Sequence, residues 1–515
     1  MTGMPPFLTA NPAAGAMIVD DLLPAAALAA MLSAVALLAC MRERVLADEG
    51  YLWYGALRTL DGEVPLRDFR SYEPGRYYWC ALWMLALGRG IVPLRVAVHA
   101  FYFIGLTCGL LALRLGGIGW PAVIVAGVVL TAWAYPHYKL FEPAMLMVAV
   151  LAGVAVLTDP GPTTILVAGT IGAGSGFVGV NYGLYSGAAL LAVTLLAGLK
   201  SGEVDLVPGL GAFFAGVILG ASPLLVLGAV ARGLLPALFE RRVRAVLARG
   251  TTNLPLPVPW PWRASGRHRV KQTFVGIYFL LLPAFALSVT VWAVAAPWAD
   301  VQAEPVVVAA GAVAAFGLHH AFSRAGLLQL ALSMSPLILG MIALLGRGLG
   351  WAVLAVLLGW GTMATVVTVH PRLLRSRRQE KYVRREVGGS MLWVSRKDAR
   401  ILHAMQSLVE RHLEPAEPLF AVPTLPALHP MLDRRSAVYD TFCVYPATER
   451  EQHAMLRSIE EQRVRLAVVH DHPLDGREEL RFSRTHPAVW SHLGTQFQPI
   501  AVPGLPAGYH VLYRT

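Results

Sequence analysis

The sequence ADEGYLWYGALRTLDGEVPLRDF occupies residues 47–69 and directly follows the first apolar stretch of the chain. A second notable segment, YEPGRYY, follows at residues 72–78. Two adjacent carboxylates, Asp48 and Glu49, therefore lie where a membrane helix would end. Charge is costly to hold near lipid, so this position indicates a functional role. The alternative is a pair of acids in a solvated loop.

The composition of the 515-residue chain is that of an integral membrane protein. Hydrophobic residues make up 56% of it and charged residues 15%, whereas soluble domains have about 45–50% and about 25%. The formal net charge is +11. Much of this charge lies in connections between apolar stretches, where it favours anionic lipids and phosphates. No recognition module accompanies it, so we do not expect nucleic acid to be a partner.

About eleven apolar stretches have the length of a membrane span, roughly 17–24 residues. They start near residues 22, 95, 118, 142, 163, 184, 208, 273, 304, 326 and 349. The stretch Tyr77–Gly88 is also apolar, but at about twelve residues it is too short to cross. Its aromatic residues suit the headgroup level. We therefore expect it to be a helix that lies flat on the membrane.

If Tyr77–Gly88 does not cross, the polar segments of the chain all fall on one face of the membrane. They are Asp48-Glu49, residues 135–142, Asn181-Tyr182, residues 231–272, residues 319–324 and the tail. The opposite connections contain few cations, namely Arg114, Lys200 and Arg347. The positive-inside rule alone would thus place the polar face in the cytoplasm.

Residues 231–272 predict a long connection on this polar face. Apolar residues at helical spacing predict an interfacial amphipathic helix over Leu234–Leu247. The following segment, residues 254–262, has a proline at every second position and cannot be regular helix. The connection either encloses a substrate or is a plain linker.

The composition changes after His370. Arg372–Arg385 predicts a basic linker, and residues from about 386 onward have the length of an ordinary soluble domain. Their periodicity predicts two short buried strands and two helices. These elements are Leu419–Val422, Leu466–Val469, Ala399–Arg411 and Glu449–Gln462. We therefore expect a mainly α, polytopic helical bundle over residues 1–370, and a basic linker with a small soluble α/β domain over residues 371–515.

The pattern D-E-G-Y-L-x-Y-G-A-x-R-x-L-x-G-E-V-P-L-R-D-F, followed by Y-E-P-G-R-Y-Y, resembles the first outer loop of GT-C-type glycosyltransferases. That superfamily includes protein O-mannosyltransferases and the lipid A aminoarabinose transferase. Its members are polytopic enzymes that move a sugar from a polyprenyl-phosphate carrier onto an acceptor outside the membrane. The close match covers residues 48–78.

The resemblance implies an inverting glycosyltransferase in the bacterial cytoplasmic membrane. Its donor would be a polyprenyl-phosphate sugar, and its acceptor lipopolysaccharide, another envelope glycan or a protein. The active site and the C-terminal domain would face the periplasm or cell exterior, against the positive-inside count. We follow the resemblance here, because arginine can be retained on that face to bind phosphate.

The resemblance also implies roles for individual residues. Asp48 matches the first acid of the motif and would be the base, while Glu49 would orient the acceptor, the base or a metal ion. Glu142 lies where family members carry a second acid; alternatively, it is a helix-start carboxylate stabilised by the helix dipole. The remaining motif residues would shape the loop and the acceptor site. They are Arg58, Asp68, Tyr72 and Glu73.

Transfer from a lipid phosphate needs cationic support for the departing phosphate. Arg324, at the end of an apolar stretch beside His319 and His320, is the first candidate, and Lys139 the second. A divalent cation stays an open question, because adjacent histidines on a helix point in different directions. His470-Asp471-His472 also invites a metal interpretation, but no third ligand follows at a diagnostic spacing, which favours a solvated turn.

Two other functions remain in competition at this stage. A transporter or flippase of lipid-linked sugars would line its path with Asp48, Glu49 and Arg324. The two halves of the chain, however, show none of the internal symmetry that many transporters have. A non-catalytic membrane scaffold displaying the soluble tail is the third hypothesis. The resemblance at Asp48-Glu49 favours the enzyme over both.

Overall fold

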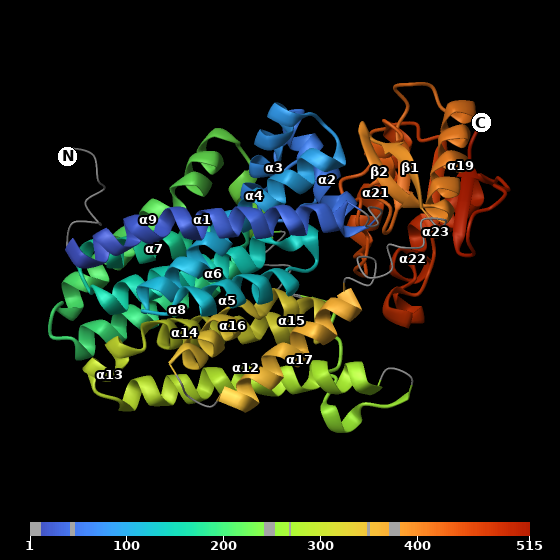
Figure 1. Cartoon of the computed structure of the whole chain (residues 1–515). Helices are drawn as coiled ribbons and strands as arrows, with labels where there is room; N and C mark the ends of the chain where they lie inside the picture. Colours follow the sequence, from blue (N-terminus) through green and yellow to red (C-terminus); the bar gives the residue numbers. More distant parts are fainter. Residues whose placement is uncertain (1–11, 42–46, 241–252, 267–268, 348–350, 370–381) are drawn as a thin grey trace. The chain divides into compact units, whose positions relative to one another are not determined.

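The computed structural model describes residues 12–41, 47–240, 253–266, 269–347, 351–369 and 382–515. The chain forms two compact units, whose residues can be followed by colour in Figure 1. The first unit comprises Met1–Ala39, Val98–Arg232 and Arg242–Leu374. The second comprises Cys40–Ala97, Gly233–Arg241 and Arg375–Thr515.

The first unit is a bundle of apolar helices, most of which run side by side in Figure 1. Apolar stretches of this length form helices because the backbone must satisfy its own hydrogen bonds in lipid. The helices are α1 (Pro12–Cys40), α4 (Ile91–Leu115), α5 (Trp120–Ala132), α6 (Phe141–Thr158), α7 (Pro162–Val178), α8 (Val180–Lys200), α9 (Leu206–Val230), α12 (Arg269–Ala295), α13 (Trp298–Ala303), α14 (Pro305–Ser323), α15 (Leu327–Ser333), α16 (Ser335–Gly346) and α17 (Trp351–Val369), with the 3-10 helices η2 (His137–Lys139) and η4 (Pro261–Arg263).

Seven of the described helices are long and apolar enough to cross a membrane. They are α1 from Asp20 onward, α4, α6, α8, α9, α12 and α14. The helices α15 and α16 are apolar enough together but are bent by 56° at the break between them, as in a broken span or a re-entrant loop. Shorter apolar helices are α5, α7 and Ala355–Val366 of α17. Each predicted apolar stretch thus coincides with a helix or with the bent pair, and the prediction of a mainly α, polytopic membrane fold is confirmed.

Close packing in this bundle depends on small residues. The helix α14 packs against α6, α8, α12 and α16, and its buried residues are mostly valine, alanine and glycine. The helices α7 and α9 approach still more closely. A Cβ atom at Gly216 of α9 would lie 2.0 Å from the carbonyl oxygen of Leu166 in α7. Small residues at such contacts let helix backbones approach in a membrane.

The second unit contains α2 (Asp48–Leu60), α3 (Pro74–Leu87) and the first residues of α4. The acids expected in a loop instead occupy the first turn of α2, where the helix dipole favours negative charge. The short helix predicted over Tyr77–Gly88 is present as α3, which is not among the candidate spans of the described residues. Its exposed face carries Leu82, Leu85 and Leu87, as expected of a helix beside lipid.

The remainder of the second unit is the predicted small α/β domain. Four strands pair in the order β3 (Leu419–Val422), β4 (Leu466–His470), β6 (Tyr509–Tyr513) and β5 (Gln498–Pro499). Strands β3 and β4 are parallel, while β6 is antiparallel to β4 and to β5. Phe420 and Val469 belong to a core with α21 (Glu449–Glu461) and α23 (Pro487–Gln496). Leu419 and Val468 face a second core with α19 (Arg396–His412). Helices therefore cover both faces of the sheet.

Two connecting segments differ from the prediction or are described only in part: the basic linker and the amphipathic helix. The basic linker expected over Arg372–Arg385 ends earlier, because β1 (Tyr382–Val387) pairs with β2 (Ser390–Ser395) in a hairpin. The turn between these strands uses Gly388 and Gly389, both with positive φ. Of the amphipathic helix expected over Leu234–Leu247, the structure has α10 (Leu234–Leu238). Residues 241–252 lie outside the described residues.

In the second unit, residues 50–70 pack directly against residues 427–440 of the C-terminal domain. Gly50 lies against Ala427, where an added Cβ would be 2.4 Å from the alanine Cβ. The Tyr54 hydroxyl accepts a hydrogen bond from the Ser436 amide at 2.7 Å. Arg70 forms an ion pair with Asp440. The helix that carries Asp48 and Glu49 is therefore built onto the C-terminal domain.

Candidate functional site

The predicted site residues fall into two groups, one in each unit. The second unit contains Asp48, Glu49, Arg58, Asp68, Tyr72 and Glu73. The first unit contains Lys139, Glu142, His319, His320 and Arg324.

The two acids at the start of α2 have different environments. Successive helix residues are rotated by about 100°, so adjacent carboxylates point apart. Glu49 is 7% exposed, and its two oxygens accept hydrogen bonds from Nε and Nη2 of Arg95 at 2.7 and 2.8 Å. Asp48 is half-buried, and its carboxylate makes no hydrogen bond or ion pair with any other described residue. Of the two acids, Asp48 therefore has the carboxylate that is available to a substrate.

Arg95 is a functional candidate that the sequence analysis missed. It is 2% exposed, and its Nη1 also donates to the carbonyl oxygen of Cys40 at 2.6 Å. A buried arginine needs such partners, because an unpaired guanidinium is costly to remove from water. The available signal was a charged residue within the first turns of an apolar stretch, which is itself unusual.

Arg58 and Asp68 hold the turn that connects α2 to α3. Arg58 donates from Nε to Glu63 at 2.7 Å and from Nη2 to the Asp68 carbonyl oxygen at 3.2 Å. Its guanidinium carbon also lies 4.7 Å from the centre of the Phe69 ring. The Asp68 carboxylate accepts a bond from the Val64 amide at 2.7 Å. Hydrogen bonding to Arg67 lowers the pKa of Asp68, so this carboxylate is ionised. Both residues therefore shape the segment through contacts within it.

Tyr72 and Glu73 lie just before α3, beside an aromatic cluster. The Tyr72 ring stands edge-on to Tyr51, with 5.2 Å between ring centres, and carries the Arg76 guanidinium 4.8 Å from its own centre. The Tyr72 amide donates to the Tyr77 hydroxyl at 3.1 Å. Glu73 is buried at the N-cap of α3. The structure thus brings both residues to the same surface of α2 and α3.

In the first unit, the histidine pair at the end of α14 meets two tyrosines at the start of α8. The Tyr185 hydroxyl and His319 Nδ1 are 2.6 Å apart and share a hydrogen bond. The rings of Tyr182 and His320 are 5.2 Å apart, centre to centre. The prediction that Asn181-Tyr182 and His319-His320 share one face agrees with these contacts. Tyr185 was not predicted.

The remaining members of this group lie on neighbouring segments. Lys139 is half-buried in η2, near enough to His320 for its charge to act on that ring. Glu142 is buried in the first turn of α6. Arg324 follows α14 directly, and its Nη1 donates to the carbonyl oxygen of Leu254 at 3.2 Å. Cations and aromatic rings are therefore gathered where α6 and α8 begin and α14 ends.

Comparisons with known proteins identify the fold. No family model matches the chain, and no curated protein matches its sequence. Among solved structures, the crystal structure of ArnT from Cupriavidus metallidurans bound to undecaprenyl phosphate matches with a TM-score of 0.54. The match covers 95% of this chain and 97% of that chain at 14% identity. The chain has the ArnT fold. The resemblance to GT-C-type proteins is thereby confirmed at the level of fold.

A second structure, ArnT from Cupriavidus metallidurans in the apo state, matches with a TM-score of 0.39 and 16% identity, over 96% of this chain and 98% of that chain. At 14% identity, the first match shows a shared fold and does not show the roles of individual residues.

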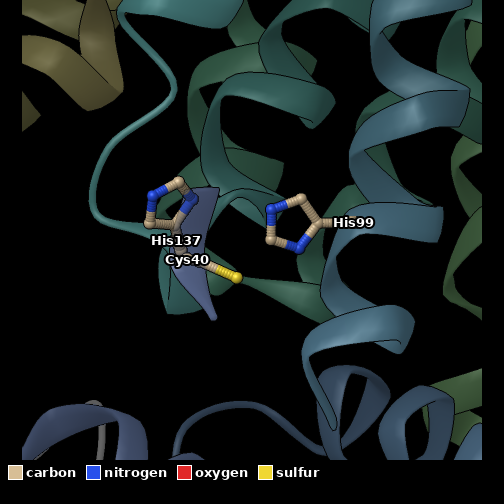
Figure 2. A group of neighbouring side chains, drawn as sticks. All are labelled: Cys40, His99 and His137. Carbon is tan, nitrogen blue, oxygen red and sulfur yellow. The ribbon is translucent and has the colours of Figure 1, made fainter. Parts of the chain in front are cut away.

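The first unit also contains two buried histidines, His99 and His137, the second of which lies in η2 together with Lys139. Figure 2 shows the rings of His99, from α4, and His137, from η2; Cys40, drawn with them, belongs to the second unit. The two rings are stacked with 5.5 Å between their centres. Ring nitrogens of the pair lie within 4.8 Å of each other, and imidazole is a common metal ligand. At the predicted pair, Tyr185 already occupies one nitrogen of His319.

The HDH segment of the tail is a structural turn. The His470 ring stacks on His472 and on Tyr509, with centres 4.0 and 4.2 Å apart. Burial lowers the pKa of His470 to about 4. The Asp471 carboxylate accepts from the amide and hydroxyl of Ser483, both at 3.0 Å. The sequence favours a solvated turn, but the segment is packed: His470 ends β4, Asp471 is buried, and both histidines are half-buried.

Proposed function

We propose that this protein is an inverting glycosyltransferase that moves a sugar from a polyprenyl-phosphate carrier to an acceptor outside the bacterial cytoplasmic membrane. The observation that carries the proposal is the first turn of α2. The Asp48 carboxylate makes no hydrogen bond or ion pair with another described residue, whereas the Glu49 carboxylate is held by Arg95. The undecaprenyl phosphate bound to ArnT, which has the same fold, supports a donor on such a carrier.

The chemistry needs a base for the acceptor hydroxyl. Asp48 takes the hydroxyl proton while the acceptor oxygen attacks the anomeric carbon from the face opposite the carrier phosphate. The bond between the anomeric carbon and the phosphate oxygen breaks, and the polyprenyl phosphate leaves with the electron pair. The anomeric configuration is inverted. A positioned general base contributes about 10²–10⁴-fold to such a step.

The departing phosphate needs cations where its negative charge develops. Arg324 offers a planar guanidinium suited to two-point phosphate contacts, and Lys139 a compact charge. His319 and His320 complete this group, with His319 held by Tyr185. We assign the donor phosphate to these residues and the role of a second acid to Glu142.

The acceptor side is assigned to the surface of α2 and α3. Arg58 and Asp68 fix the backbone between these helices, while Tyr72 and Glu73 line its end. The acceptor is lipopolysaccharide, another envelope glycan or a protein, and this side faces the periplasm or cell exterior. In the aromatic cluster of Tyr51, Tyr72 and Tyr77, Tyr51 and Tyr77 are buried and Tyr72 is half-buried. Tyr72 is therefore the ring that can meet a sugar, because an aromatic face offers apolar contact with a polar edge.

The test is transfer of a radiolabelled sugar from total lipid-linked donors by purified protein. Asp48→Asn keeps the shape of the side chain and removes the base, so transfer should fall about 10²–10⁴-fold while donor lipid still binds. The matched control is Asp61→Asn at the opposite end of the same helix, where the acid pairs with Arg89.

Asp61→Asn should transfer at the wild-type rate. If Asp48→Asn does so as well, Asp48 is not the base. A wild-type protein that carries lipid-linked sugar across vesicles without transferring it would instead be a flippase.

A further inference from the structure

Three segments of the second unit converge on the guanidinium of Arg95. Arg95 comes from the start of α4, Glu49 from the first turn of α2, and Cys40 is the last residue of α1. Two bonds run to the Glu49 carboxylate and a third to the Cys40 carbonyl oxygen. All three residues are buried. The guanidinium thus links the ends of three helices through direct hydrogen bonds.

The geometry of these bonds is directional. A guanidinium that meets a carboxylate through two parallel bonds fixes both the distance and the rotation of its partner. The third bond goes to a carbonyl at a helix C-terminus, a group that lacks a partner inside its own helix and carries partial negative charge. Arg95 therefore determines how the first turn of α2 is turned relative to the Cys40 carbonyl and α4.

Asp48 belongs to that same turn. Its backbone precedes that of Glu49, so any rotation of Glu49 about the helix axis moves the Asp48 carboxylate as well. Both Glu49 oxygens are bonded to Arg95, which leaves Asp48 to meet the substrate. We propose that Glu49 and Arg95 are positioning residues, which hold the Asp48 carboxylate at the acceptor hydroxyl and do not touch the reacting atoms. This inference rests on the proposed function.

The experiment compares kcat and KM in three changes to this ion pair. Arg95→Lys keeps the charge but loses the planar fork, and Glu49→Gln loses the charge but keeps the shape. A double variant, Glu49→Leu with Arg95→Met, removes both charges and so avoids leaving one buried and unpaired. In each, kcat should fall about 10²-fold, the loss expected from a displacement of about 1 Å at the reacting atoms. The KM for donor should change less than about twofold.

The control is the exposed ion pair at the other end of α2, between Asp61 and Arg89, whose side chains are 34% and 55% exposed. Arg89→Gln should leave both kcat and KM unchanged. A folded double variant, as judged by thermal unfolding, with wild-type kcat would overturn the inference. If the double variant does not fold, the split between kcat and KM in Arg95→Lys decides: wild-type kcat, or an equal change in both constants, refutes it.

Asp48→Asn separates this inference from the proposed function. If Asp48→Asn transfers sugar normally, the base assignment is wrong and the positioning role is lost with it. If Asp48→Asn is inactive while the folded double variant keeps its kcat, the proposed function stands and the positioning role alone is wrong.

Discussion

At the scale of single residues, Arg324 offers the clearest test of donor binding. Its side chain follows α14 and contacts the backbone at Leu254. Arg324→Ala removes a cation from the departing phosphate, so donor affinity and transfer should weaken by about 2–4 kcal/mol, by analogy with loss of an oxyanion donor. Binding of a labelled polyprenyl phosphate measures the affinity directly.

A matched arginine lies on the connection that precedes α12. Arg263 is exposed in η4, and Arg263→Ala removes the same charge without touching the group around His319 and His320. Donor affinity should be unchanged in Arg263→Ala. Equal losses in the two variants would mean that the connection attracts phosphate only through its general positive charge.

At the scale of helices, the approach of α7 and α9 can be tested with one methyl group. Gly216→Ala would place its Cβ 2.0 Å from the Leu166 carbonyl oxygen, so the helices must separate. Overpacking of this kind costs about 1–3 kcal/mol. Gly211, on the same helix α9, has open space where a Cβ would be. Thermal unfolding in detergent should show a lower midpoint for Gly216→Ala and an unchanged or higher midpoint for Gly211→Ala. Equal midpoints would mean that the two helices can separate at no cost.

The small elements of the C-terminal domain contain a second testable feature, two buried neutral histidines. Burial lowers the pKa of His429 to about 3 and that of His486 to about 4, from an ordinary value of 6.5. The unfolded chain therefore binds more protons than the folded domain between these values. The contribution of these two histidines to the free energy of unfolding is fully present above pH 6.5. It is lost as the pH falls toward the folded pKa values, by up to about 1.4 kcal/mol per pH unit for each histidine.

Hydrogen exchange measures this loss in the full-length protein. After correction for the chemical rate, exchange in β3 and α20 (Leu428–Met431) should accelerate between pH 7.5 and 5. His429→Phe keeps the ring stacked on Tyr54, 4.7 Å away in the wild type, and removes one titrating group. In His429→Phe, the pH dependence of the opening free energy should correspond to about one fewer proton taken up on unfolding than in the wild type. Identical slopes in wild type and variant would show that His429 does not contribute.

The elements predicted correctly are those with a strong local signal. Apolar stretches long enough to span a membrane identify themselves by composition, and Leu419–Val422 and Leu466–Val469 are continuous apolar runs of the kind found in buried strands. The hairpin β1–β2 was missed because its exposed residues alternate with few buried ones, and because Arg384 and Arg385 belong to a basic run.

The candidate site was less predictable, because its contacts join distant residues. The motif at Asp48-Glu49 could be found in the sequence, but nothing local links Glu49 to Arg95, 46 positions later. The same holds for Tyr185 and His319, separated by 134 positions. Such pairs follow from helix packing, which periodicity does not specify. A charged residue inside an apolar stretch is the one signal that would have singled out Arg95.

At the scale of the whole molecule, the topology predicts which positions a reagent outside the cell can reach. We expect the connections at Asp61, Arg263 and Glu479 to face outward and Glu203 to face the cytoplasm. These positions are exposed within their units. Cys108 is the one partly exposed native cysteine among the described residues, and the other three are buried. The experiment therefore uses a background in which Cys108 is replaced by alanine. A membrane-impermeant thiol reagent should then label cysteines placed at the first three positions and spare Glu203→Cys. The reverse pattern would place the site face in the cytoplasm, as the positive-inside count does.

The joining of Arg70 to Asp440 also has a consequence for how the protein is made. The two residues are 370 positions apart, so at about 5–20 residues per second the ribosome needs roughly 20–75 s to synthesise the second after the first. Throughout that interval α2 and α3 exist without the surface that covers Gly50 and Tyr54. A chain truncated before β3 would contain all the candidate spans of the described residues and still leave these helices uncovered. The packing of α2 and α3 is thus completed only after the C-terminal domain has been synthesised and has folded against them.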